Sequence, residues 1–198
     1  MAGRSPMPRP MPFSRPRRIS LTWYSPRSNE RASASTAEIT CAVVCSVIIP
    51  SYRSAGTIAG CLGALRAQAG APAFEVIVVD SSPGGDGTAA IVARDFPEVR
   101  LIRRAEQTDP ATARNLGAAE ARGDILCFID SDCLAAPDWL ARLVARIGEG
   151  HSAVGGAIAN ANPETLASWA GYFCEFREFL PGGPARPAAN LTIGNSAY

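Results

Sequence analysis

The sequence predicts an α/β domain in which a mostly parallel sheet is flanked by helices. Two observations support this. Short continuous apolar runs alternate with segments of helical periodicity, and polar residues follow the apolar runs. Continuous apolar runs are typical of strands that are buried on both faces. Their alternation with helices indicates βαβ crossovers, which produce parallel neighbours.

The first half of the domain supplies two strands and two helices. "CSVIIP" (45–50) and "FEVIVVD" (74–80) are the continuous apolar runs. Between them, residues 54–68 carry Ile58, Leu62 and Leu65 at helical spacing, which predicts a helix. A shorter helix is expected over 87–96, where Asp86 lies just before the first turn and favours its N-terminus.

The second half repeats the pattern, with strands expected at 98–104 and 124–130. The helix expected over 109–123 has Asp109 as N-cap, Pro110 at its first position and Gly123 past its end. A helix over 136–150 places Leu140, Leu143, Val144 and Ile147 on one face. A strand at 152–160 and a helix at 163–180 follow, and residues 188–198 are left without an assignment.

Composition excludes several classes of function. The 198 residues are 47% apolar and carry a net charge of +1, which argues against a nucleic-acid binder driven by phosphate attraction. The chain contains no lysine, so a Walker lysine and Schiff-base chemistry are excluded. Six cysteines without a CxxC pair favour a reduced, cytoplasmic setting over a disulfide framework.

Residues 1–40 differ from the rest of the chain. They carry seven Arg and two Glu, whereas residues 41–198 carry twelve Arg and sixteen acidic residues. The segment is rich in Pro, Arg and Ser without periodicity, so we expect a disordered basic tail followed by a domain over 41–198. A basic arm that contacts a membrane surface is the alternative. The longest apolar stretch, 39–50, has 12 residues and is too short to span a bilayer.

Ligands of parallel α/β sheets bind outside the carboxyl ends of the strands. The polar residues that follow the four predicted strands should therefore meet along one edge of the sheet. They lie at positions 50–53, 80–82, 103–104 and 130–132.

The last of these groups, in "CFIDSDC", holds two carboxylates. Residues two apart in extended chain point to the same side, so Asp130 and Asp132 could face one cation. An all-oxygen set suits Mg²⁺ or Mn²⁺. The competing interpretation is a polar turn after a strand, because Asp and Ser favour turns.

Two further segments carry candidate ligands. Asp80 ends the second strand, where it could accept hydrogen bonds from a ribose or a base, although a mobile glycine loop that caps a helix explains the segment equally well. Arg114 and Asn115 interrupt an Ala-rich helix, and an Arg there offers a bidentate fork for phosphate. An exposed helix charge is the alternative for Arg114.

Taken together, four segments resemble the family 2 glycosyltransferases, which have the GT-A nucleotide-sugar-binding fold. The resemblance lies in the segments "SVIIPSYRSAGTIAGCLGAL", "FEVIVVDSSPGGDGT", "ARNLGAAEARGDILCFIDSDC" and "NLTIGNSAY". They occur in the same order as in the family and span about residues 45–198. The resemblance implies transfer of a sugar, with inversion, from a nucleotide diphosphate donor to the hydroxyl of a carbohydrate or lipid-linked acceptor. It also implies a place in cell-envelope polysaccharide synthesis, at the cytoplasmic face of a membrane.

The resemblance also assigns residues. Pro50, Ser51 and Tyr52 match the first nucleoside loop, and Asp80 matches the family's strand-end carboxylate for the nucleoside, with Ser81 where the family usually has a second acid. Further matches are Arg114 and Asn115 near the nucleotide, Asp130 for ribose and metal, and Asp132 as the more direct ligand of Mg²⁺ or Mn²⁺.

An inverting transfer needs a general base, and the family's base lies downstream of its "GN" element. Gly194-Asn195 is followed here by three residues, so we expect a truncated chain whose base lies beyond Tyr198. Two alternatives stay open. One is a non-catalytic nucleotide-sugar-binding fragment, and the other is a D-x-D phosphatase, which would carry its motif on the first strand.

Overall fold

The computed structural model describes residues 43–198 and contains a six-stranded sheet with the order β3-β2-β1-β4-β6-β5. The strands are β1 (Cys45–Ser51), β2 (Phe74–Asp80), β3 (Arg100–Arg103), β4 (Ile125–Ile129), β5 (Val154–Gly155) and β6 (Asn195–Ala197). β1 to β4 run parallel, while β6 is antiparallel to both β4 and β5. The mostly parallel sheet is therefore confirmed. The tail expected at 1–40 lies outside the described residues.

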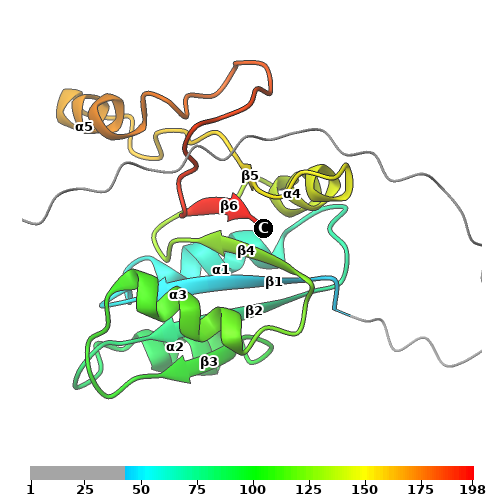
Figure 1. Cartoon of the computed structure of the whole chain (residues 1–198). Coiled ribbons are helices and arrows are strands. Elements are labelled where there is room, and N and C mark those ends of the chain that lie inside the picture. The colour runs from blue at the N-terminus through cyan, green and yellow to red at the C-terminus, as the bar shows by residue number, and fades with distance from the viewer. Residues whose placement is uncertain (1–42) are drawn as a thin grey trace, which may run out of the picture. The chain divides into compact units, whose positions relative to one another are not determined.

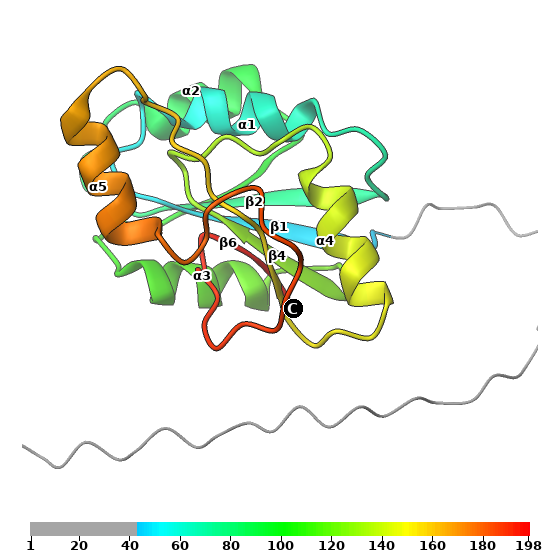
Figure 2. The ribbon, with the colours of Figure 1, turned by 90° about the horizontal axis from the view of Figure 1, so that it is seen from above.

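Five helices connect these strands: α1 (Ile58–Arg66), α2 (Thr88–Asp95), α3 (Pro110–Ala119), α4 (Trp139–Gly148) and α5 (Leu166–Phe176). α1 and α2 lie over one face of the sheet and α3 lies over the other (Figures 1 and 2). Asp109 caps α3 as expected, since its carboxylate accepts a hydrogen bond from the Thr112 N–H. Asp86 accepts one from the Thr88 N–H at the start of α2.

The strands alternate their side chains between two cores. Val47, Ile49 and Val78 point to the face covered by α1 and α4, where the larger apolar cluster lies. Ile77 and Val79 point to the α3 face and pack with Ala113. Because β1, β2 and β4 bury side chains on both faces, their sequences read as continuous apolar runs.

The C-terminal third departs from the expected elements. The strand expected over 152–160 is reduced to β5, and the helix expected over 163–180 contracts to α5. Residues 195–197, which had no assignment, form β6 beside β4. β5 pairs Val154 and Gly155 with Ala197 and Ser196, and β6 begins one residue further along, at Asn195, so residues 157–160 run past the end of the partner strand. Between residues 43 and 198, no helix has the length and apolar character that crossing a bilayer requires.

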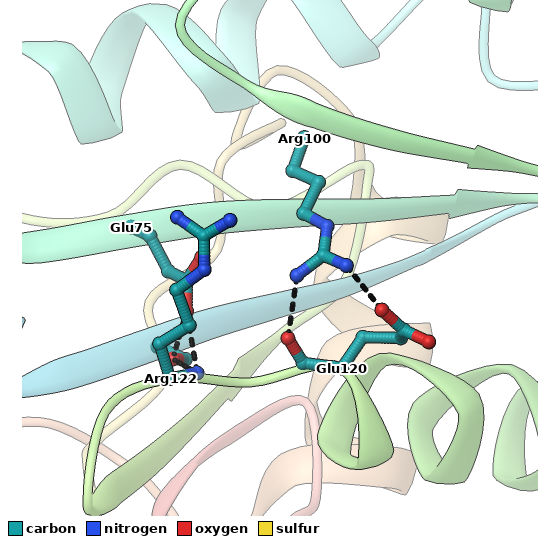
Figure 3. A network of polar contacts seen from close by, with 5 residues as sticks. Glu75, Arg100, Glu120 and Arg122 are labelled. Carbon is teal, nitrogen blue, oxygen red and sulfur yellow. Dashed lines mark hydrogen bonds and ion pairs between the residues drawn. The ribbon is translucent and has the colours of Figure 1, made fainter.

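A polar network fixes the turn between α3 and β4 at the amino edge of the sheet (Figure 3). The buried Ser46 hydroxyl donates to Glu75 at 2.8 Å and accepts from the Gly123 N–H at 3.0 Å. Glu75 also accepts from the Arg122 N–H at 2.7 Å. A Cβ at Gly123 would lie 2.5 Å from the Cys45 backbone, so only glycine allows the turn to approach β1. The network therefore anchors β4 beside β1.

We expect Ser46→Ala to lower the free energy of unfolding by about 1–3 kcal/mol, because the buried hydroxyl that bridges Glu75 and the half-buried Gly123 N–H is lost. Urea denaturation followed by circular dichroism measures this change. Ser152→Ala, at an exposed position, is the matched control and should leave stability unchanged. Equal stabilities for the two variants would contradict the anchoring role of Ser46.

Gly117 lets α3 approach the sheet, because a Cβ there would lie 2.5 Å from Ile48 Cγ2. Gly117→Ala should therefore destabilise the domain by about 1–3 kcal/mol through overpacking. Gly63→Ala, in α1, meets no atom within 4 Å and should instead stabilise by about 0.5–1 kcal/mol through helix propensity. Thermal unfolding of the two variants checks the contrast, and shifts of the same sign would contradict it.

Candidate functional site

A cavity of about 420 Å³ lies at the carboxyl ends of β1, β2 and β4. Its lining comes from the segments that follow these strands, from the end of the β3–α3 segment and from the first two turns of α3. The residues are Pro50, Ser51, Tyr52, Arg53, Ser54, Thr57, Ser81, Thr108, Pro110, Ala113, Arg114, Asp130, Ser131 and Asp132. Three of the four polar groups expected at this edge therefore converge. The fourth, Arg103-Arg104, lies outside the cavity lining.

Hydrogen bonds to the β2–α2 segment hold the loop that follows β1. The Arg53 N–H donates to Ser82 Oγ at 2.8 Å, and Arg53 has a positive φ of 52°. The Ser54 N–H donates to Thr88 Oγ1 at 3.1 Å. A non-glycine residue at positive φ persists only where its surroundings fix it. The loop is therefore held in one conformation, with the Tyr52 side chain on the cavity wall.

Asp86 gives this arrangement a second anchor. Its carboxylate accepts hydrogen bonds from the Ala55 N–H at 3.2 Å and from the Thr88 hydroxyl at 2.9 Å. Partial burial raises the pKa of this carboxyl, but the hydrogen bonds from Thr88 and Ala55 outweigh it and hold the pKa below its usual range. Asp86 is therefore ionised at neutral pH, and it joins the two loops that flank the cavity.

Asp80 lies behind the cavity wall. Its side chain is buried, and Oδ1 accepts from the Ser82 hydroxyl at 2.7 Å and from the Ser82 N–H at 3.2 Å. The lining residue at this point is Ser81, whose hydroxyl donates to the Ser51 carbonyl at 3.3 Å. Asp80 therefore shapes the β2 end of the site, and its expected contact with a nucleoside stays a prediction.

An ion pair crosses the cavity floor. Arg114 Nη2 lies 2.5 Å from Asp130 Oδ1, and the Arg114 side chain is 10% exposed. On the other side of Asp130, a Cβ at Gly194 would lie 2.3 Å from Oδ2. Asp130 is therefore held between α3 and the segment that enters β6. Asn115, the next residue in α3, is exposed and lies outside the lining, so its expected role also stays a prediction.

Asn195, the first residue of β6, fixes the start of this strand. Asn195 accepts a hydrogen bond from Trp139 Nε1 at 2.8 Å and donates to the Ala157 carbonyl at 2.9 Å. The "GN" pair thus has two structural tasks, since Gly194 allows close approach to Asp130 and Asn195 ties β6 to α4.

Asp132 lies at the β4 end of the cavity, where Oδ1 accepts a long hydrogen bond of 3.8 Å from Cys133 Sγ. It is exposed, and its neighbour Ser131 shares a 2.7 Å hydrogen bond with Ser54 on the opposite loop. No cluster of three or more His, Cys, Asp or Glu side chains suited to a metal occurs within residues 43–198. Protein ligands for a cation here are thus the two aspartates, of which Asp130 is already paired with Arg114.

The nearby cysteines are not nucleophiles. Burial, together with the charges of Cys133, Asp132 and Asp130, raises the pKa of the Cys61 thiol to about 12. Burial and the two carboxylates raise the pKa of Cys133 to about 11. Both thiols are protonated at neutral pH, and since the thiolate is the reactive form they have low reactivity.

Four buried side-chain polar atoms of the described residues have no hydrogen-bond partner, and three of them belong to the cavity lining. These are Ser51 Oγ, Thr108 Oγ1 and Arg114 Nε. Buried polar groups without a partner are rare in folded proteins. The three residues all line one cavity, which makes this cavity the candidate site for a polar ligand that a side-chain rotation would let these atoms reach.

Sequence reasoning expected nine of the lining residues at this edge of the sheet, namely Pro50, Ser51, Tyr52, Arg53, Ser81, Arg114, Asp130, Ser131 and Asp132. It missed Ser54, Thr57 and Thr108, which follow no strand directly and carry no charge. Their only signal is the Ser and Thr content of the loops, which is common to loops in general.

Comparison with known proteins agrees with this geometry. Residues 46–192 match the family described as Glycosyl transferase family 2. Glycosyltransferase AglE of Haloferax volcanii is 39% identical over 124 residues, which are 60% of this chain and 40% of the relative. Succinoglycan biosynthesis protein ExoO of Rhizobium meliloti is 34% identical over 120 residues, which are 61% of this chain and 33% of the relative.

Solved structures give the same result. TarS 1–349 of S. aureus in complex with UDP-GlcNAc aligns with a TM-score of 0.54 at 28% identity, over 63% of this chain and 37% of that chain. The mannosyltransferase PcManGT of Pyrobaculum calidifontis, in complex with GDP-Man and Mn²⁺, aligns with a TM-score of 0.51 at 31% identity, over 60% of this chain and 36% of that chain.

The chain spans at most about two fifths of the length of these relatives. The phosphatase alternative required the D-x-D motif on the first strand, whereas Asp130 and Asp132 follow β4. The sheet, the cavity and the matched residues all point to one assignment: the chain has the GT-A fold and belongs to the family 2 glycosyltransferases.

Proposed function

We propose that this domain binds a nucleotide diphosphate sugar with Mg²⁺ or Mn²⁺ and transfers the sugar, with inversion, to an acceptor hydroxyl. The observation that carries the proposal is the set of three buried, unpartnered polar atoms in one cavity. A buried polar group without a partner costs about 1–3 kcal/mol. A ligand that supplies the missing hydrogen bonds therefore recovers free energy in addition to its other contacts.

The order of the strands suggests how such a donor would lie. The cavity crosses β2, β1 and β4, and two strand spacings measure about 10 Å. Asp132 lies at the β4 end and suits the diphosphate with its cation. Ser81 lies at the β2 end, where the nucleoside would fit, and Tyr52 on the β1 loop offers an aromatic face for stacking.

The charges of the lining favour a cation that arrives with the diphosphate. Arg53 and Arg114 balance Asp130 and Asp132, so the lining has no net formal charge. A diphosphate brings excess negative charge, which a divalent cation neutralises. Mg²⁺ is commonly held by one or two carboxylates plus substrate phosphates, so Asp132, with Asp130 beside it, fits such an ion without a third protein ligand.

In the proposed reaction, the bound cation would act as a Lewis acid for the leaving diphosphate. The protein residues position the donor. Asp132 would hold the cation at the β4 end, and Arg114 would fix Asp130 so that one carboxylate stays oriented toward the ribose. The Ser54–Ser131 hydrogen bond would keep the two loops at a constant separation. Preorganised polar groups of this kind stabilise developing charge without reorganisation.

The lining contains no carboxylate besides Asp130 and Asp132, and the proposal assigns the general base to neither. This favours a second candidate for the chain as given, which is donor binding without turnover. The comparisons support the donor class, since TarS 1–349 was solved with UDP-GlcNAc and PcManGT with GDP-Man and Mn²⁺. The name of ExoO supports a carbohydrate acceptor. Location at the cytoplasmic face of a membrane stays a prediction.

The metal role predicts the effect of Asp132→Asn. Mn²⁺ should raise the affinity of the natural sequence for UDP or GDP. In Asp132→Asn this rise should be smaller by about tenfold or more, because the variant lacks the negative charge that holds the cation. Isothermal titration measures the nucleotide affinity of both proteins with and without Mn²⁺.

Asp124→Asn is the matched control, since Asp124 is an exposed aspartate at the opposite end of β4. It should bind like the natural sequence. The metal role of Asp132 is wrong if Asp132→Asn retains the full effect of Mn²⁺.

A further inference from the structure

Thr108 is a lining residue that neither the sequence motifs nor the family match assigns to a role. It lies between β3 and α3, two residues before the first residue of the helix. Its hydroxyl oxygen is buried and has no hydrogen-bond partner. The residue itself is partly exposed and forms part of the cavity wall, so a rotation about its Cα–Cβ bond can turn the hydroxyl toward a ligand.

Nothing nearby satisfies this hydroxyl. The neighbouring Asp109 uses Oδ1 for the Thr112 N–H and Oδ2 for the Thr112 hydroxyl. Pro110, on the other side of Asp109, has no N–H to donate. The start of α3 is therefore complete without Thr108, and the hydroxyl has no structural task in the described protein.

The position of Thr108 selects the part of the donor that it would meet. The segment that leaves β3 leads into α3, where Ala113 packs against Ile77 and Val79 of β2, so we place Thr108 on the β2 side of the cavity. At that end the hydroxyl of Ser81 is bonded to the Ser51 carbonyl, and Oδ1 of Asp80 is bonded to Ser82. Thr108 is the hydroxyl at the β2 end of the lining that has no partner.

We propose that Thr108 is a specificity-determining residue whose hydroxyl forms a hydrogen bond with the polar edge of the donor's nucleobase; this rests on the proposed function above. A hydroxyl can donate or accept, so it selects by position: it favours a base that places a polar atom within reach and disfavours a base that places none there. A site built around a hydrogen bond discriminates against ligands that cannot form it, because a buried polar group is then left unpaired. Thr108 thus contributes to the choice between nucleoside diphosphates.

The test compares Thr108→Val, which keeps the shape and removes the hydroxyl, with Thr108→Ser, which keeps the hydroxyl. Affinities for UDP, GDP, CDP and ADP are measured by isothermal titration with Mn²⁺ on the full chain. Thr108→Val should lower the affinity for the preferred nucleotide on the order of tenfold and the affinities for the others less, so the ratio between them becomes smaller. Thr108→Ser should restore most of the preference.

Thermal unfolding without nucleotide separates this role from a structural one. Removing an unpaired buried hydroxyl should leave the Tm of Thr108→Val unchanged or higher, whereas loss of a structural hydrogen bond would lower it. A lower Tm combined with unchanged relative affinities would overturn the proposal.

The remaining outcomes are also decisive. If Thr108→Val lowers the affinity for all four nucleotides equally, the proposed contact with the base is wrong and the hydroxyl contacts the ribose or a phosphate. Unchanged affinities in Thr108→Val would overturn any contact while leaving the proposed function intact. Failure of the natural sequence to bind any of the four nucleotides would overturn both.

Discussion

The site depends on the parallel pairing of β1 with two neighbours at once. Ser51 at the end of β1 is in register with Asp80 at the end of β2, and β4 pairs with β1 on the other side. Parallel strands bring their carboxyl ends to one edge, so the polar residues that follow three buried strands must meet there. The apolar side chains on both faces supply the stability that keeps this polar edge in place.

At that edge, contacts between the segments that follow the strands fix the positions of the polar side chains. The Arg114–Asp130 pair connects α3 to the end of β4, and the Ser54–Ser131 hydrogen bond connects the β1 loop to the D-x-D turn. Asp132 is exposed between these fixed points, where the Cys133 thiol donates a long hydrogen bond of 3.8 Å to its Oδ1. One carboxylate of "DSD" is thus held by an arginine of the protein itself. In the proposed function, the other carboxylate would bind an external cation.

The elements that sequence reasoning identified are those determined by local patterns. Continuous apolar runs located β1, β2 and β4, and Asp109 with Pro110 located the start of α3. β6 was missed because its three residues form a strand only through pairing with β4 and β5, which are distant in sequence. Thr108 was missed for the same reason, since its significance comes from what surrounds it in space. For Asp80, the end of the strand was predicted correctly, but the orientation of the side chain was not. Its carboxylate is bonded to Ser82 and lies outside the cavity lining.

In the proposed function, a nucleoside diphosphate and a divalent cation occupy the edge formed by β1, β2 and β4. Paramagnetic broadening of backbone amide signals by Mn²⁺, recorded with and without UDP or GDP, locates both. With nucleotide present, we expect selective loss of the signals of Tyr52, Ser81 and Asp132, while the signals of Glu75 and Asp124 at the opposite edge persist. Strongest broadening at Glu75 and Asp124, or no selective broadening with either nucleotide, would show that this edge is not the binding site.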